Sequence, residues 1–346
     1  MNAKKYSELR DPSRPPLQDL LPLSFPLSLY VETTNRCNFR CRYCPMSLKG
    51  YSQVAGGFRT MTLDEFKRIA DDIKANQRLK VLRFYLMGEP LLNPQLPEMI
   101  RYSHSLRLAE RTELTTNGSL LDEAKSRAIL GSGLDYLRVS ISAVDPERQK
   151  AITQSEITVE EIRHNVETFR RIRDESRRSS PFLYVKMLAT GRSDEDRRFL
   201  ELYRDLADEA VIEQPMNWDG FDQHDLLGAY YQGNQTGEER AFYPYPKEVC
   251  PFPFYTLVVN VNGDVTVCCV DWNKATRVGN VFDASLQSIW EGAALRDLRR
   301  LHVSHRRRAN PSCRDCRFLF TSPDNLDHMP ADLAEKLVGP SKEIHE

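Results

Sequence analysis

Three cysteines directly after a short apolar segment limit the possible folds of this chain more than any other feature of its sequence. The apolar run 27–33 is typical of a buried strand, and Cys37, Cys41 and Cys44 follow it at intervals of four and three residues. Three thiolates at this spacing can bind one four-iron cluster and leave its fourth iron without a protein ligand. That open iron can bind a substrate or a cofactor.

A structural zinc site is the alternative interpretation of the triplet. Such a site is normally closed by four ligands, and no further Cys or His occurs between Cys44 and His104. The spacing therefore favours an iron-sulfur cluster. Tyr43 completes the pattern Cys-x3-Cys-x-aromatic-Cys, and with this pattern the chain resembles the radical S-adenosylmethionine (radical SAM) superfamily. The resemblance implies that Tyr43 also belongs to the cofactor site.

Composition excludes several classes of protein. The chain has 346 residues and a formal net charge of −1, which argues against a dedicated nucleic-acid binder. No apolar run reaches the roughly 18 residues of a membrane span, and the first residues lack the apolar core of a secretion signal. We therefore expect a cytoplasmic protein with no membrane and no nucleic-acid partner. In a reducing compartment its eight cysteines are better interpreted as metal ligands than as disulfides.

Strand-like and helix-like segments alternate along the first two thirds of the chain. Capping patterns begin the amphipathic segments at Thr62 with Glu65, at Thr158 with Glu161, and at Ser193 with Asp196. Alternation of this kind predicts an α/β fold with a parallel sheet built from right-handed βαβ units, here a partial (β/α)6 TIM-like barrel as in the resembled superfamily. The predicted strands are 27–33, 81–86, 113–116, 136–142, 183–189 and 210–213.

The second predicted strand ends in Met87-Gly88-Glu89-Pro90. Loops at the carboxyl ends of parallel strands converge on one face, and a glycine there lets the backbone approach a ligand. By itself the motif also fits a simple turn with an exposed acid. The resembled superfamily has Gly-Gly-Glu-Pro at this place, which implies that Gly88, Glu89 and Pro90 hold the amino group of S-adenosylmethionine. Met87 replaces the first glycine.

Polar residues also end the next four predicted strands. Asn117, Ser140 and Ser142 have short side chains that suit either helix capping or hydrogen bonds to a ligand. The resemblance favours contacts with the ribose or carboxylate of S-adenosylmethionine. Further along lie three charged residues that either face the barrel or form a solvated rim. We assign Arg192 to cofactor binding and Lys186 and Glu213 to catalysis.

A second cysteine group occupies the C-terminal third. Two β-rich runs, 255–261 and 264–268, flank Asn262-Gly263, which is typical of a two-residue hairpin turn, and one helix is predicted over 285–302. A zinc ribbon can be built from similar parts. The arrangement resembles the twitch domain of radical SAM enzymes, a shortened SPASM domain, which implies one auxiliary four-iron cluster. Its implied ligands are Cys250, Cys268, Cys313 and Cys316, and Cys269 is left over as a structural thiol.

These features predict five segments along the chain. They are an N-terminal extension 1–26, a radical SAM partial barrel 27–217, a linker 218–249, a twitch-like auxiliary-cluster domain 250–320 consisting of a small hairpin and helix, and a tail 321–346.

The resemblance implies an enzyme that uses S-adenosylmethionine and two 4Fe-4S clusters. An electron donor such as flavodoxin or ferredoxin would drive cleavage to a 5′-deoxyadenosyl radical, which removes hydrogen from the substrate. Twitch-domain relatives that act on aminocyclitols and sugars favour dehydrogenation of a small polyol, sugar or aminocyclitol. The alternatives are an epimerase of a sugar or aminoglycoside, in which Cys269 would return hydrogen, and a peptide-modifying enzyme. A non-enzymatic zinc-binding scaffold is a more remote alternative.

Overall fold

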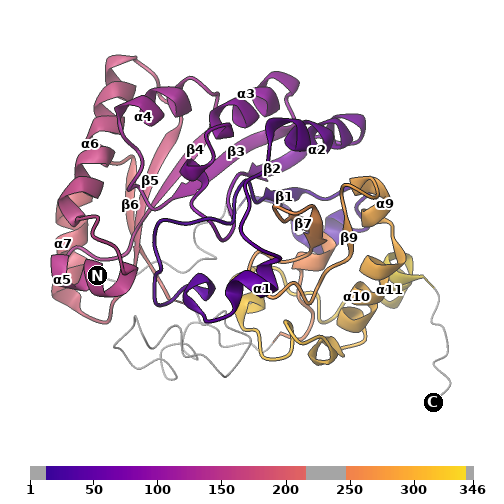
Figure 1. Ribbon diagram of the computed structural model, residues 1–346. Coiled ribbons are helices and arrows are strands. Elements are labelled where there is room, and N and C mark those ends of the chain that lie inside the picture. The colour runs from indigo at the N-terminus through magenta and orange to yellow at the C-terminus, as the bar shows by residue number, and fades with distance from the viewer. Residues whose placement is uncertain (1–12, 216–246, 340–346) are drawn as a thin grey trace.

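A computed structural model describes residues 13–215 and 247–339 (Figure 1). Within these residues a single nine-stranded sheet has the order β6-β5-β4-β3-β2-β1-β7-β8-β9. The strands are β1 (Ser28–Val31), β2 (Leu79–Arg83), β3 (Ala109–Thr116), β4 (Tyr136–Ile141), β5 (Phe182–Leu188), β6 (Glu209–Glu213), β7 (Thr256–Val259), β8 (Asp264–Thr266) and β9 (Gly279–Asn280). The helices are α1 (Tyr51–Ala55), α2 (Leu63–Ala75), α3 (Leu96–Leu106), α4 (Glu123–Leu130), α5 (Pro146–Thr153), α6 (Val159–Glu175), α7 (Ser193–Tyr203), α9 (Leu286–Trp290), α10 (Ala293–Val303) and α11 (Ala331–Val338).

Strands β1 to β6 pair in parallel and in chain order, which confirms the predicted α/β fold with a partial (β/α)6 barrel. Helices follow the strands and cover the outer face of the sheet (Figure 1). On this face Phe66 of α2 is fully buried and its ring lies 5.5 Å from that of Phe84. Burial of one such side chain contributes about 2–3 kcal/mol to folding.

Two of the three predicted helix starts are confirmed in detail. Thr62 and Thr158 each form a complete capping box with the glutamate three residues on. The capping pattern predicted for Ser193 with Asp196 is wrong. Arg192 is the N-cap residue of α7, and its side chain makes no capping bond. Asp196 instead accepts hydrogen bonds from the backbone N–H and hydroxyl of Thr190, at 3.1 and 2.9 Å. Its carboxylate therefore closes the loop between β5 and α7.

The two faces of the barrel strands differ in polarity. In β4, Leu137 and Val139 are fully buried in the apolar core beneath the helices, whereas Arg138 and Ser140 alternate with them and point to the opposite, interior side of the sheet. The same alternation in β5 places Lys186 on the interior face. Polar and charged side chains therefore line the inside of the barrel.

The C-terminal strands continue the barrel sheet instead of forming a separate one. β7 pairs in parallel with β1, and β7 and β8 form the predicted antiparallel hairpin. Its turn differs from the prediction: Asn260 bonds to Asp264 at 2.8 Å, so the loop has three residues, Val261 to Gly263. Gly263 has φ +85°, the conformation that a three-residue hairpin loop requires at its last position.

The helix predicted over 285–302 is two helices, α9 and α10. The chain is extended at Gly292, with ψ 157°, so this residue caps α10 and interrupts the helical hydrogen bonds. A small second core joins the C-terminal region to residues near both ends of the described chain. Its buried members are Leu17, Val249, Phe254, Leu326, Leu337 and Val338.

The predicted linker 218–249 lies outside the described residues except for its last three positions. Among the described residues, no helix combines the length and the apolar character needed to cross a membrane.

Candidate active site

The first three cysteines lie in the loop that follows β1. The backbone N–H groups of Arg40 and Arg42 donate to the last carbonyls of α5, Thr153 at 2.8 Å and Ile152 at 2.9 Å, which fixes the loop against that helix. The pKa of Cys37 is raised to about 11 and that of Cys44 to about 12, mainly by burial, and the neighbouring thiols contribute to both shifts. Thiols in this setting need bound cations to ionise, so the donor set suits an iron cluster.

In residues 13–215 and 247–339, no group of three His, Cys, Asp or Glu side chains is arranged to hold a single metal ion. A four-iron cluster binds each thiolate through a different iron atom, so its ligands lie farther apart than those of one ion.

Glu89 lies next to the first cysteine group and is 2% exposed. Its carboxylate accepts hydrogen bonds from the hydroxyl of Thr116 at 2.7 Å, the N–H of Asn117 at 2.8 Å and the N–H of Leu91 at 3.0 Å. Burial nevertheless raises its pKa to about 7, because these bonds offset only part of the desolvation and no cationic side chain contributes. A ligand ammonium group would restore the ionised carboxylate, so the residue fits the amino group of S-adenosylmethionine.

Gly88 allows a close approach between two segments of the site. A Cβ atom at this position would lie 2.2 Å from the carbonyl oxygen of Thr34 and 2.7 Å from that of Arg36. The sequence predicts this glycine for access to a ligand, and the structure adds a second reason, which is contact with the backbone that leads into the cysteine loop. Pro90 begins a short 3₁₀ turn, Pro90–Leu92, that supports Glu89.

We predict that Gly88→Ala lowers the melting temperature of the iron-free protein by about 5 °C, because the new methyl group displaces the cysteine loop. The variant should also bind less iron at the first cysteine group. Circular dichroism during heating and iron analysis would measure both effects. Gly131→Ala is a matched control, since its Cβ would lie no closer than 3.4 Å to other atoms. Equal melting temperatures for the two variants would contradict this explanation.

Three further predicted cofactor residues, Tyr43, Asn117 and Ser142, lie in the cysteine loop or directly after β3 and β4. The hydroxyl oxygens of Tyr43 and Ser142 lie 3.0 Å apart, which joins the cysteine loop to the end of β4. The amide of Asn117 donates to Asn38 at 3.0 Å, and its Oδ1 accepts two bonds from Ser119. Its side chain therefore organises the turn after β3, whereas the capping alternative is wrong for this residue, because Asp122 is the N-cap of α4.

Ser140 faces the barrel interior opposite Lys186 of β5. Arg192 lies at the start of α7, near Glu195. The assignment of both residues to the cofactor stays a prediction.

The two predicted catalytic residues form an ion pair inside the barrel. Lys186 Nζ lies 2.6 Å from Glu213 Oε2, and the hydroxyl of Tyr184 donates to Glu213 Oε1 at 3.0 Å. Burial raises the pKa of Glu213, but Lys186 and Arg138 outweigh it, so the pKa lies below its ordinary value. The carboxylate is therefore ionised at neutral pH and can accept a hydrogen bond or a proton from a hydroxyl group.

A charged cluster deeper in the barrel was missed by sequence reasoning. Glu113 accepts a hydrogen bond from Arg83 at 2.8 Å and pairs with Arg111 at 2.5 Å, while Arg138 lies 5.3 Å from the ring of Tyr184. Burial raises the pKa of Glu113, but the three arginines lower it to about 2. The sequence signal that could have predicted this cluster is the set of charged residues Arg83, Arg111, Glu113 and Arg138 in neighbouring strands. In a strand, alternate residues lie on the same face of the sheet.

The second cysteine group surrounds one cavity. Cys250, Cys268, Cys313 and Cys316 all line it, together with the buried side chain of His302. Burial raises the pKa of Cys313 to about 12 and that of Cys250 well above its ordinary value, and neighbouring thiols add to both shifts. Four half-buried cysteines around one cavity fit a cluster in which every iron has a cysteine ligand.

Cys269 is not among the residues that line this cavity. Its thiol hydrogen-bonds with Cys268 and with Tyr30 of β1, and Arg83 lies nearby. These contacts join Cys269 to β1, and its expected role as a structural thiol stays a prediction.

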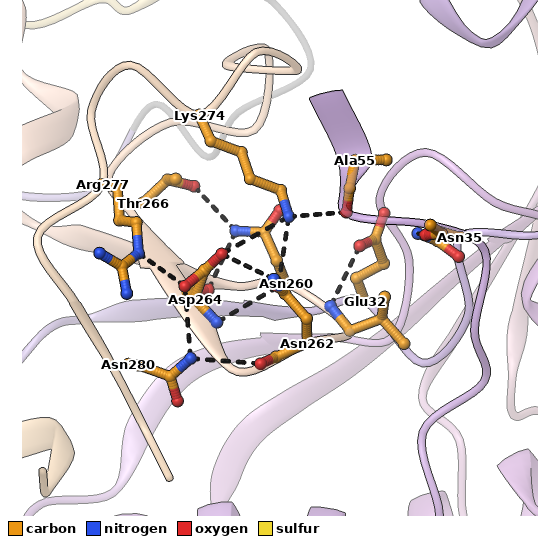
Figure 2. Close-up of polar contacts among 12 residues, drawn as sticks. Glu32, Asn35, Ala55, Asn260, Asn262, Asp264, Thr266, Lys274, Arg277 and Asn280 are labelled. Carbon is orange, nitrogen blue, oxygen red and sulfur yellow. Dashed lines mark hydrogen bonds and ion pairs between the residues drawn. The ribbon is translucent and has the colours of Figure 1, made fainter. Parts of the chain in front are cut away.

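A buried polar network joins the cysteine loop to the hairpin (Figure 2). Glu32, directly after β1, accepts a hydrogen bond from the N–H of Val261 at 3.1 Å. Lys274 donates to the carbonyl of Ala55 at 3.1 Å and to Oδ1 of Asn262 at 3.2 Å. Burial raises the pKa of Glu32 to about 7, although the bond from Val261 and the charge of Lys274 oppose the shift. The hairpin is therefore held against the strand from which the first cysteines extend.

Comparisons with known proteins agree with this geometry. The model of the radical SAM superfamily matches residues 31–203, half of the chain, and that of the SPASM iron-sulfur cluster-binding domain matches residues 250–317. A GTP 3′,8-cyclase of Chlorobaculum tepidum is 31% identical over 63% of this chain and 61% of its own length. A PqqA peptide cyclase of Granulibacter bethesdensis is 34% identical over 37% of this chain and 32% of its own. The chain spans less than two thirds of the length of these curated relatives.

Two solved structures share the fold. BtrN in complex with AdoMet and 2-DOIA is 18% identical, with a TM-score of 0.52 over 84% of this chain and 92% of that one. Streptococcus suis SuiB bound to the precursor peptide SuiA is 15% identical, with a TM-score of 0.60 over 80% of this chain and 67% of that one.

Proposed function

Because the chain belongs to the radical SAM superfamily and uses S-adenosylmethionine and two 4Fe-4S clusters, we propose that it dehydrogenates a small polyol, sugar or aminocyclitol. The observation that carries this proposal is the single cavity lined by Cys250, Cys268, Cys313 and Cys316. Four cysteine ligands would occupy all four irons of a cluster bound here, which would leave no position for substrate and make electron transfer the remaining use of this cluster. The near-complete coverage of BtrN, whose structure holds 2-DOIA, supports a small-molecule substrate.

S-adenosylmethionine, when bound and reduced by one electron, supplies a 5′-deoxyadenosyl radical that takes hydrogen from an unactivated carbon, and the auxiliary cluster supplies a one-electron acceptor. Oxidation of an alcohol to a ketone removes one hydrogen atom, one electron and one proton. The protein must therefore provide a base for the proton. An external donor such as flavodoxin or ferredoxin is the proposed source of the reducing electron.

The residues of the barrel have separate proposed roles. Glu89 holds the amino group of S-adenosylmethionine, and the Tyr43 and Ser142 pair fixes the cysteine loop beside it. Glu213, kept ionised by Lys186, accepts the proton of the substrate hydroxyl group. Lys186 and Glu213 lie on the interior face near the carboxyl ends of β5 and β6, the side of the barrel on which the cysteine loop also lies.

The test is a panel of polyols, sugars, aminocyclitols and peptides incubated anaerobically with the reconstituted enzyme, S-adenosylmethionine and a reductant. A small polyol should stimulate formation of 5′-deoxyadenosine and give a product two mass units lighter, with one methionine per product. The similarity to SuiB and to PqqA peptide cyclase would instead favour a peptide substrate. Formation of 5′-deoxyadenosine that only peptides stimulate would refute the small-molecule proposal.

Epimerisation is a second candidate, favoured by the position of Cys269. Its thiol lies beside Tyr30 of β1, and a thiol is a group that can return a hydrogen atom to a substrate radical. For dehydrogenation, Cys269→Ala should keep the yield of lighter product. For epimerisation in D2O, the wild-type product would instead gain one deuterium, and the variant would form 5′-deoxyadenosine without product. Mass spectrometry separates the two outcomes.

A further inference from the structure

His302 occupies the last turn of α10 and is fully buried, with no exposed surface. It lines the same cavity as Cys250, Cys268, Cys313 and Cys316. An imidazole ring in a cavity otherwise formed largely by cysteines and apolar side chains requires an explanation, because burying a polar group without a partner opposes folding.

The orientation of the ring follows from one hydrogen bond. The backbone N–H of Cys250 donates to Nδ1 of His302 at 3.2 Å. A nitrogen that accepts a hydrogen bond cannot carry a proton, so the proton of the ring is on Nε2. This Nε2–H group is buried, and no residue of the described chain accepts a hydrogen bond from it. The ring therefore offers an unused donor within the wall of the cavity.

We propose that Nε2–H of His302 donates a hydrogen bond to a sulfur atom of the auxiliary cluster and thereby raises its reduction potential. Reduction adds negative charge to the cluster, and a hydrogen bond to sulfur stabilises the reduced form more than the oxidised form. A cluster bound in the cavity would provide a sulfur atom as the hydrogen-bond acceptor. A higher potential makes the cluster a better acceptor for the electron that remains on an oxidised substrate.

His302 has a charged neighbour at the cavity, Arg307. Its Nη1 is bonded to the carbonyl of Cys313, and its Nε is a second buried donor without a hydrogen-bond partner, 3.7 Å from a carboxylate oxygen of Glu248. Its charge acts on the cluster from any orientation, whereas the effect of His302 depends on a directed N–H bond. Substitutions at His302 can therefore be distinguished by whether they keep a donor.

The proposal requires the auxiliary cluster but not the proposed substrate. The experiment uses the full chain carrying Cys37, Cys41 and Cys44 changed to alanine, so that only the auxiliary cluster contributes to the spectrum. In this parent, we compare His302→Leu, which removes the donor, with His302→Gln, which keeps an N–H group. A redox titration followed by electron paramagnetic resonance should give a lower midpoint potential for His302→Leu and a smaller shift for His302→Gln.

His305→Asn is the matched control. His305 is exposed just beyond α10 and has φ +56°, a conformation that asparagine tolerates. Its midpoint potential should equal that of the parent. An unchanged potential in His302→Leu, at four irons per chain, would overturn the proposal.

If His302→Leu loses the cluster, the parent protein labelled with 15N-histidine decides the question. Electron-nuclear double resonance should detect a coupled histidine 15N and an exchangeable proton at the reduced cluster, and their absence would reject the hydrogen bond. Iron analysis distinguishes an incorrect hydrogen-bond proposal from the absence of the auxiliary cluster. A parent without about four irons contradicts the auxiliary cluster, and with it the proposed function.

Discussion

Changing Cys37, Cys41 and Cys44 together to alanine should reduce cleavage of S-adenosylmethionine to less than about one hundredth of the wild-type rate. The three thiols are the only cysteines in the loop after β1, and the adjacent Glu89 is placed to hold the amino group of the same molecule. The loop itself is anchored by backbone bonds to α5 that do not involve the thiols. The variant should therefore fold and keep the second cluster.

Iron and sulfide analysis after anaerobic reconstitution checks this result. The wild type should contain about eight irons and eight sulfides per chain, and the triple variant about half of each. Cys269→Ala is the matched control and should keep all eight irons. Wild-type iron near four per chain with stoichiometric zinc would contradict the two-cluster assignment.

Glu213→Gln should lower the rate of product formation by about 10² to 10⁴-fold, the range expected for loss of a general base. Glutamine is close in shape to glutamate and can still accept the hydroxyl bond of Tyr184, but it cannot take the proton of a substrate alcohol. Formation of 5′-deoxyadenosine should continue, because hydrogen abstraction does not require this carboxylate. Chromatography of both products would measure the ratio of 5′-deoxyadenosine to oxidised substrate, which should rise.

Asp208→Asn provides the control for Glu213→Gln. Asp208 is another carboxylate in an ion pair, here with Arg170 and Arg173, but it accepts a hydrogen bond from the amino-terminal end of β5, away from the predicted catalytic pair. This variant should be less stable yet keep the wild-type product ratio. If Glu213→Gln also keeps the wild-type rate and ratio, the carboxylate does not act as the base.

The strands and the division of the cysteines into two groups could be predicted from the sequence because both depend on local patterns. Apolar runs and capping residues predicted six strands in the right order. β3 begins at Ala109, four residues before its predicted start, because Glu110 and Arg111 interrupt the apolar pattern at its exposed amino end. Local signals also predicted the hairpin, but the bond between Asn260 and Asp264 that sets its three-residue loop depends on register.

The remaining features depend on contacts between distant segments. No local pattern shows that β7 pairs with β1 and continues the barrel sheet. The position of Cys269 beside Tyr30 follows from this pairing, and so could not be predicted. His302 lies 52 residues from Cys250, and only the folded chain brings its ring to the second cysteine group.

Electron paramagnetic resonance of the reduced protein, with and without S-adenosylmethionine, tests most directly whether the first cysteine group alone binds the nucleotide. The wild-type spectrum should contain two cluster signals, of which one changes when S-adenosylmethionine is added. The triple variant at Cys37, Cys41 and Cys44 should retain one signal that does not respond. A wild-type spectrum that S-adenosylmethionine leaves unchanged, or a response that persists in the triple variant, would contradict the account.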